Sequence, residues 1–151
     1  MRGALLNWAK YDRGGSIPMI FRNIFLTAPD LGNDALQGLA GQIFCGSSRN
    51  VVVFYAADDY SLRASKIPSA GEVSSRRLGH TGPDDIKKTP RNVYAFDCDE
   101  FNNEYDNPLG HTYFLSDETG KRPGKVFLQI FKGIKSGRLV HTTEVERTEI
   151  L

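Results

Sequence analysis

The sequence lacks the features that would by themselves assign it to several classes of protein. Charge of one sign is not in excess, because the 151 residues carry a net charge of +1 and 25% of them are charged. No basic face for nucleic acid or for an anionic membrane is therefore expected. Apolar runs are also short, and none approaches the roughly 18 residues that cross a bilayer. The sequence predicts a soluble globular domain with no nucleic-acid partner and no membrane span.

Cysteine and histidine are both scarce. The two cysteines, Cys45 and Cys98, form no C-x-x-C pair, which is typical of free thiols in a reducing compartment and favours a cytoplasmic location. The three histidines include no pair at i, i+4 spacing, so a metal site is not expected. Nucleotide-binding motifs of the G-x-G-x-x-G and P-loop types are absent as well. We therefore expect neither a metal nor a cofactor.

What the sequence contains is an alternation of helix-like and strand-like segments. Apolar runs such as "NVVVFYAADD" are typical of strands that are buried on both faces of a parallel sheet. Their alternation with amphipathic segments predicts an α/β fold with about three parallel strands. The expected elements are helices at 2–11, 33–44 (capped by Asn33), 60–67, 109–117 and 125–134, strands around 24–26, 50–59 and 92–100, and a long loop over 68–91 with about one helical turn.

Polar side chains that suit catalysis follow the expected strands. In a parallel sheet such side chains gather at the carboxyl ends of the strands. An acid after one strand and a histidine in the loop after the next permit a carboxylate–imidazole pair. In such a pair the carboxylate holds one tautomer and stabilises the imidazolium. His111 is the candidate base, and the candidate acids are Asp59, with Asp30 and Asp58 as alternatives.

Each candidate also has a purely structural interpretation. A histidine in "LGHTYF" can cap or pack a helix, and Asp30 in "APDLGND" can cap the helix that follows. Asp97 and Asp99 are more typical of loop anchors than of catalytic acids. His80 is interpreted as an ordinary loop residue and His141 as a solvated residue of the tail. The choice between structural and catalytic roles therefore depends on the motifs that surround the candidates.

Those motifs resemble a poorly characterised esterase- or lipase-like family of bacterial α/β-hydrolases. The resemblance covers roughly residues 1–117 and rests on "RGALLNWAKYDRGG", "FRNIFLTAPDLGNDAL", "VVVFYAADDYSLRAS", "RRLGHTGPDD" and "LGHTYF". In that family the acid lies in a pattern close to Asp-x-Ala-Leu, which "DYSL" matches with Asp59. The family histidine lies in Gly-His-Ser-Tyr-Phe, which "GHTYF" matches with His111 and with Thr112 in place of the serine. The resemblance implies a serine hydrolase that acts on a small ester or related acyl substrate.

The nucleophile of that family has no counterpart in the sequence. It is a serine in G-x-S-x-G on a sharp turn between a strand and a helix. Ser16 is followed two positions later by Pro18, and Ser48 by Asn50, so neither serine fits. The resemblance therefore implies the C-terminal part of an α/β-hydrolase fold. We expect a partial domain over 1–135 without the nucleophile half, and a poorly ordered C-terminal tail over 136–151.

Two hypotheses about function follow from this resemblance. In the first, His111 is the general base and Asp59 orients it, while the chain by itself is inactive because the serine is missing. In the second, the chain is a non-catalytic α/β module that acts by self-association or partner binding. The second hypothesis predicts a homodimer through the edge of the first strand, because an unpaired apolar edge promotes pairing between chains.

Overall fold

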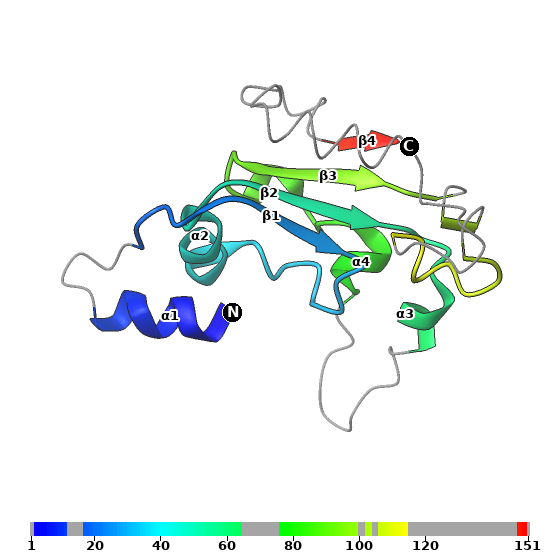
Figure 1. Cartoon of the computed structure of the whole chain (residues 1–151), viewed down its shortest axis with the longest axis horizontal. Helices are drawn as coiled ribbons and strands as arrows, with labels where there is room; N and C mark the ends of the chain where they lie inside the picture. The colour runs from blue at the N-terminus through cyan, green and yellow to red at the C-terminus, as the bar shows by residue number, and fades with distance from the viewer. Residues whose placement is uncertain are drawn as a thin grey trace.

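A parallel sheet forms the centre of the computed structural model, which describes residues 2–11, 17–64, 76–99, 102–103, 106–114 and 148–150. Its strand order is β1-β2-β3-β4, and every neighbouring pair is parallel (Figure 1). The predicted α/β fold, with three parallel strands alternating with helices, is confirmed. The strands are β1 (Phe21–Thr27), β2 (Ser48–Tyr55), β3 (Val93–Asp97) and β4 (Thr148–Ile150).

Strand β4 lies in the segment for which the sequence predicts a poorly ordered tail. Its three residues pair with the outer edge of β3, from Ala95 to Asp97. An existing edge can bind such a short segment through backbone hydrogen bonds alone, and that requires no hydrophobic pattern in the added strand. Residues 136–147, and the expected helix at 125–134, lie outside the described residues.

The helices agree with the sequence for the first element and differ for the second. The predicted helix at 2–11 is α1, whereas the helix predicted at 33–44 begins only at Gly38, with Gln37 at its N-cap. Asn33 is therefore not its cap. Residues 33–36 form turns instead, and the backbone N–H of Asn33 donates to the Arg76 carbonyl (2.7 Å). The helices are α1 (Arg2–Tyr11), α2 (Gly38–Gly46), α3 (Tyr60–Ala64), α4 (Leu78–Thr81) and the 3₁₀ turn η1 (Ile86–Lys88).

Two further segments differ from the sequence-based expectations. The region expected to be a long loop over 68–91 contains two short helices, α4 and η1, in its described part. The segment 109–117 was predicted to begin a helix, but its described residues, up to 114, form turns. Gly110 has a positive φ of 63°, which a right-handed helix does not accommodate. The loop that carries His111 is therefore irregular.

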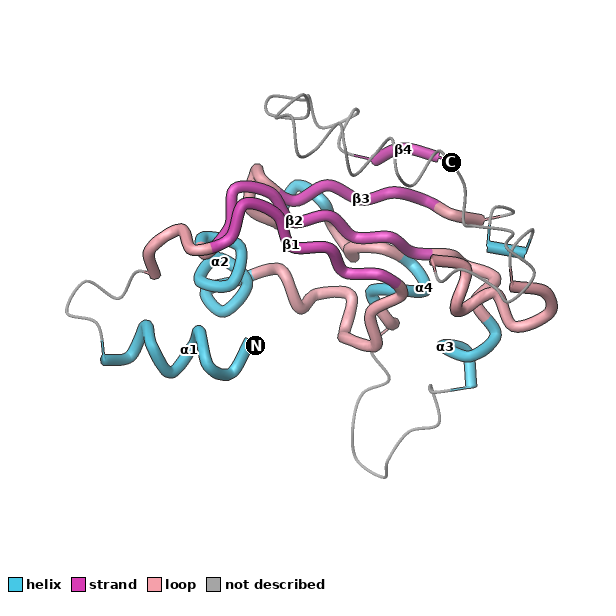
Figure 2. Tube along the Cα trace, viewed as in Figure 1, coloured by secondary structure: helices cyan, strands magenta, loops and turns pink. Residues whose placement is uncertain are grey.

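The core is built around β2, which is buried on both faces. Val51, Val52, Val53 and Phe54 are all 0% exposed. Val51 and Val53 pack into one cluster with side chains of α1 and α2, whereas Val52 and Phe54 pack into another with Tyr113. Burying each of these large side chains contributes about 1.5–3 kcal/mol, so the position of β2 in the sheet is strongly determined. Helices α1 and α2, whose side chains join the first cluster, lie on the same side of the sheet (Figure 2).

The register of the sheet brings the ends of neighbouring strands to one edge. Thr27 is paired with Phe54, and Tyr55 is paired with Asp97. The loops that follow β2 and β3 consequently leave the sheet side by side. No helix within the described ranges has the length and apolar character that crossing a bilayer requires.

Candidate active site

Asp59 lies in the turn that follows β2 and caps α3. Its side chain is fully buried, and its Oδ1 accepts a hydrogen bond from the backbone N–H of Leu62 (2.9 Å). The backbone N–H of Asp59 donates to the Ala56 carbonyl (3.2 Å), which closes the turn. A side-chain oxygen that accepts a hydrogen bond from the backbone N–H three residues later is the usual N-cap arrangement. The cap therefore holds one carboxylate oxygen and leaves Oδ2 available for another partner.

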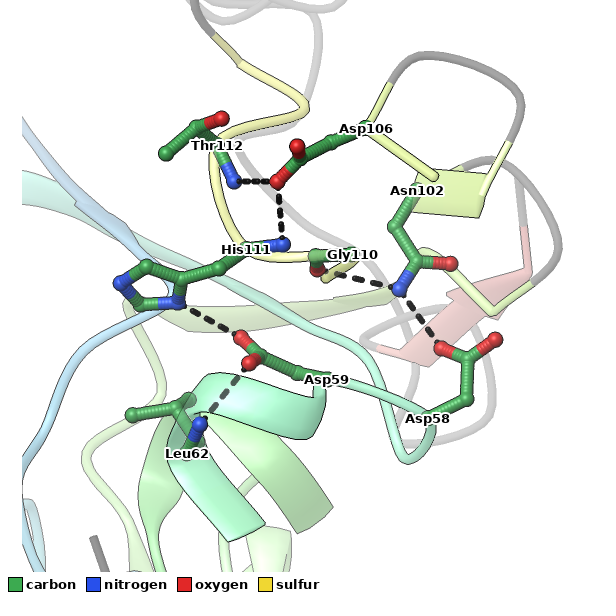
Figure 3. A network of polar contacts seen from close by, with 8 residues as sticks. All are labelled: Asp58, Asp59, Leu62, Asn102, Asp106, Gly110, His111 and Thr112. Atoms are coloured by element: carbon green, nitrogen blue, oxygen red, sulfur yellow. Dashed lines mark hydrogen bonds and ion pairs between the residues drawn. The ribbon is translucent and has the colours of Figure 1, made fainter. Parts of the chain in front are cut away.

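That partner is His111, as the sequence predicted for the pair. The Nδ1 atom of His111 lies 2.8 Å from Asp59 Oδ2, and the side chains are 33% and 0% exposed (Figure 3). A carboxylate in this position favours the tautomer with a proton on Nδ1, which leaves Nε2 unprotonated in the neutral ring. Nε2 points away from Asp59 and makes no hydrogen bond within the described residues. The pair can therefore take up and return a proton at Nε2.

The backbone of His111 is held by Asp106, a residue that the sequence reasoning missed. Asp106 Oδ2 accepts from the backbone N–H groups of His111 (2.7 Å) and Thr112 (2.5 Å). Partial burial by itself would raise the pKa of Asp106, but the N–H groups of Thr112 and His111 outweigh it and lower that pKa. Asp106 is therefore a stable anionic acceptor. The available signal was an aspartate shortly before "NPLG", because aspartate commonly bonds to backbone in such turns.

The alternative acid Asp58 contacts other residues. Its Oδ1 accepts from Asn102 Nδ2 (2.6 Å), and its Oδ2 accepts from Asn103 Nδ2. Asn102 Nδ2 also donates to the carbonyl of Gly110 (3.1 Å). The carboxylate of Asp58 is therefore bonded to amides, whereas that of Asp59 is bonded to the imidazole. Asn102 and Asn103 were not identified from the sequence.

The other alternative acid, Asp30, forms an ion pair with Arg77. Its Oδ1 lies 3.0 Å from Arg77 Nε, and the Asp30 side chain is 56% exposed. Asp30 does not cap α2, which begins eight residues later at Gly38. An ion pair this exposed contributes little to stability, about 0–1 kcal/mol. The structure thus brings only Asp59, of the three candidate acids, into contact with the His111 imidazole.

The remaining acidic side chains near this edge bond to backbone. Asp99 Oδ1 accepts from the N–H of Ala57, and Asp97 Oδ1 accepts from the N–H of Asp99 (3.0 Å). Burial raises the pKa of Asp99. The hydrogen bond from the Ala57 N–H lowers that pKa in part, and the negative charge of nearby Asp97 raises it further. These contacts agree with the loop-anchoring role expected of Asp97 and Asp99.

Of the other two histidines, only His80 lies among the residues that the structure describes. His80, interpreted from the sequence as an ordinary loop residue, is instead buried in α4, where its Nε2 accepts from Arg63 Nε (3.3 Å). His141 is outside the described residues. In the part of the chain that the structure describes, no group of three or more His, Cys, Asp or Glu side chains is arranged to hold a metal ion.

The cysteines are buried free thiols. Burial raises the pKa of Cys45 and of Cys98 to about 12. Both thiols are therefore protonated at neutral pH, and a protonated thiol is a poor nucleophile. Neither cysteine substitutes for the serine that the G-x-S-x-G motif would supply.

One comparison with known proteins gives a match. A family model described as "Alpha/beta hydrolase of unknown function (DUF900)" matches residues 4–122, which include Asp59 and His111. No curated protein and no solved structure matches the chain. The resemblance to α/β-hydrolases that the sequence motifs indicate is thereby confirmed at the level of the superfamily.

Proposed function

The chain belongs to the α/β-hydrolase family of unknown function, and on that premise we propose that it supplies the base and the acid of a serine hydrolase. In this proposal His111 is the general base and then the general acid, and Asp59 orients it. The substrate is a small ester or a related acyl compound. The observation that carries the proposal is the 2.8 Å contact between His111 Nδ1 and a fully buried Asp59.

The proposed chemistry uses the free ring nitrogen of His111. Nε2 takes the proton of a serine hydroxyl while the serine oxygen bonds to the acyl carbon. The carboxylate of Asp59 stabilises the imidazolium that forms. Nε2 then returns the proton to the alcohol oxygen as its bond to the acyl carbon breaks. Water repeats the two transfers and releases the acid, so the imidazole is regenerated.

The burial of Asp59 supports a chemical role for this pair beyond helix capping. A cap at the surface needs one carboxylate oxygen, and the second oxygen is then satisfied by water. The whole Asp59 side chain, including this second oxygen, is 0% exposed. The oxygen is bonded to the His111 imidazole, which is itself one-third exposed. A buried anion costs free energy unless it is fully bonded, and His111 completes the bonding of Asp59 while presenting Nε2.

The serine itself is not assigned to these 151 residues, because they contain no G-x-S-x-G motif. The test therefore uses the protein carrying a C-terminal tag and purified from the cells that make it. A fluorophosphonate reagent forms a covalent adduct with an activated serine. We expect an adduct on a serine of the purified protein or of a tightly bound partner. We also expect His111→Ala to lower the labelling rate by roughly 10³-fold.

The matched control is Asp30→Asn, which removes the exposed alternative acid and its ion pair with Arg77. It should be labelled at the rate of the unchanged protein. Labelling of His111→Ala at the unchanged rate would overturn the catalytic assignment. A preparation in which no serine is labelled, in the chain or in a partner, would favour the second candidate function.

That second candidate is self-association of a non-catalytic module. It is favoured by a groove of about 700 Å³ between α1 and α2, and by exposed apolar side chains in β1 and just before it. In the described sheet β1 pairs with β2 alone, and an edge of this kind can pair with a second copy. The relevant side chains are Leu6, Ala9, Leu39 and Ile43 in the groove, Met19 and Ile20 just before β1, and Phe25 within it.

The oligomeric state tests this candidate directly. Light scattering at several protein concentrations should give a dimer that Phe25→Glu converts to a monomer, because a carboxylate on a pairing edge disfavours association. A protein that is monomeric at every concentration would exclude self-association through β1.

A further inference from the structure

Two adjacent aspartates in the turn after β2 are linked to the His111 loop in different ways, one directly and one through Asn102. Asp59 bonds to the imidazole, whereas Asp58 bonds to Asn102, whose amide also bonds to the Gly110 carbonyl (Figure 3). The first contact reaches the side chain of His111, and the second reaches the backbone of the residue just before it. One turn of the chain therefore bonds directly to the side chain of His111 and, through Asn102, to the backbone of Gly110.

The chemistry of an asparagine side chain suits position 102. Its single NH₂ group donates to Asp58 Oδ1 (2.6 Å) and to the Gly110 carbonyl (3.1 Å), while its Oδ1 accepts from the N–H of Asn103 (2.9 Å). The side chain is fully buried, so these bonds are not exchanged for water. An aspartate there would place oxygen against two oxygens, and an alanine would leave both acceptors without a donor.

Gly110 is required by the same contact. A Cβ added there would lie 2.5 Å from Asn102 Nδ2, and the φ of Gly110 is +63°. Both the close approach and the positive φ favour glycine. The glycine before His111 is therefore explained by the asparagine that bonds to its carbonyl.

The loop between Asp106 and Phe114 contains no helix or strand, so other contacts must fix its position. Asp106 shapes the loop from within, through bonds to the N–H groups of Gly110, His111 and Thr112. The Asn102 bridge instead ties the loop to the turn after β2, as does the bond from the N–H of Tyr60 to the Leu109 carbonyl (3.1 Å). The distance between the loop and Asp59 thus depends on contacts of this second kind.

We propose that Asp58 and Asn102 are positioning residues for His111, acting through the backbone of Gly110. They keep the imidazole within bonding distance of Asp59 and leave Nε2 in a fixed direction. This inference rests on the proposed catalytic function of His111. Neither residue touches a reacting atom, so their effect is on the placement of the imidazole.

The test measures the imidazole itself by nuclear magnetic resonance. A proton on Nδ1 that is bonded to a carboxylate gives a separate downfield signal, and its exchange rate with water reports how firmly the bond is held. We expect Asn102→Ala to speed this exchange by about tenfold, in accordance with the loss of the one bond by which Asn102 holds the loop, that to the Gly110 carbonyl. Asp58→Asn keeps one acceptor oxygen, so its effect should lie between that of Asn102→Ala and none.

Asn92→Ala is the matched control. Asn92 Nδ2 also bridges two acceptors, the carbonyls of Cys45 (2.8 Å) and Ser48 (2.9 Å), but at the opposite end of the strands. It should lower the melting temperature and leave the exchange of the His111 proton within about twofold. If Asn102→Ala does not fold, Asp58→Asn alone decides the question.

The two proposals fail in distinguishable ways. Unchanged exchange of the His111 proton in both Asn102→Ala and Asp58→Asn would overturn the positioning role, whatever the activity. An equal acceleration in Asn92→Ala would also overturn it, because the effect would then reflect general destabilisation. Faster exchange in the two site variants, together with absent serine labelling in the unchanged protein, would retain the positioning role and reject the proposed function.

Discussion

The two ends of the sheet satisfy their polar groups with different chemistry. At the amino end of β2 the groups are neutral: Ser47 Oγ donates to the Phe44 carbonyl (2.7 Å), Ser48 Oγ donates to the Asn50 carbonyl (2.7 Å), and Asn92 bridges two carbonyls. At the carboxyl end the groups are largely ionisable, with His111 among four aspartates: Asp58, Asp59, Asp97 and Asp99.

This difference separates folding from function in the same three strands. Neutral donors and acceptors are sufficient to close a sheet end without loss of stability. Gathered carboxylates repel one another, and burying one costs free energy, so each must be offset by its own bonds, such as those that Asp59 makes to Leu62 and His111. Functional groups in parallel sheets are characteristically found at the carboxyl ends. The contrast therefore supports the carboxyl end as the functional end of this domain.

The largest expected effect comes from Asp59→Asn at the carboxyl end. The amide oxygen can still cap α3, but the NH₂ group would face His111 Nδ1 and favour a proton on Nε2. That tautomer cannot accept a proton at Nε2, so serine labelling should fall by roughly 10³–10⁴-fold. The ring tautomer, measured by ¹⁵N chemical shifts, should change with it. A labelling rate within tenfold of the unchanged protein would remove the distinction between the two ends.

A smaller effect, on the free energy of unfolding, is expected when one glycine at each end of the sheet is replaced by alanine. Gly110→Ala places a Cβ against Asn102 in a backbone with positive φ, so it should lower the free energy of unfolding by about 1–3 kcal/mol. Gly46→Ala, at the end of α2 before β2, meets nothing within 4 Å. It should be neutral or stabilising by up to about 1 kcal/mol. Urea unfolding of both variants measures the difference, and equal destabilisation would contradict the close approach at Gly110.

The smallest expected effect concerns pH and Asp106. Its pKa is lowered in the folded chain, because the N–H groups of Thr112 and His111 outweigh the effect of burial. A lowered pKa stabilises the fold above the ordinary pKa of aspartate, and this contribution is lost as pH falls through the folded value. Asp106→Asn should therefore remove part of the acid-induced loss of stability, about 0.5–1 kcal/mol, as expected for a solvent-screened cap. Unfolding measured at neutral pH and near pH 3 tests this, and parallel pH curves would contradict it.

The sequence predicted the elements whose signal is a continuous apolar run. The strands β1, β2 and β3 and the helix α1 lie where the hydrophobic pattern placed them, because burial is the main force that selects them. The start of α2 was wrong, since Asn33 is used in a turn against Arg76. The helix predicted from 109 was wrong for its described part, because Gly110 and Asp106 impose a turn there.

The chain composition and order by themselves determined a parallel α/β sheet, with acids after one strand and a histidine after the next. Only the tertiary structure decided which acid contacts the histidine. Asp58 and Asp59 are adjacent, and neighbouring side chains of an extended turn point in different directions. One consequently bonds to Asn102 and the other to His111. Asn102 and Asp106 likewise acquire their roles through bonds to backbone atoms of the loop, and the sequence does not specify which backbone atoms a side chain reaches.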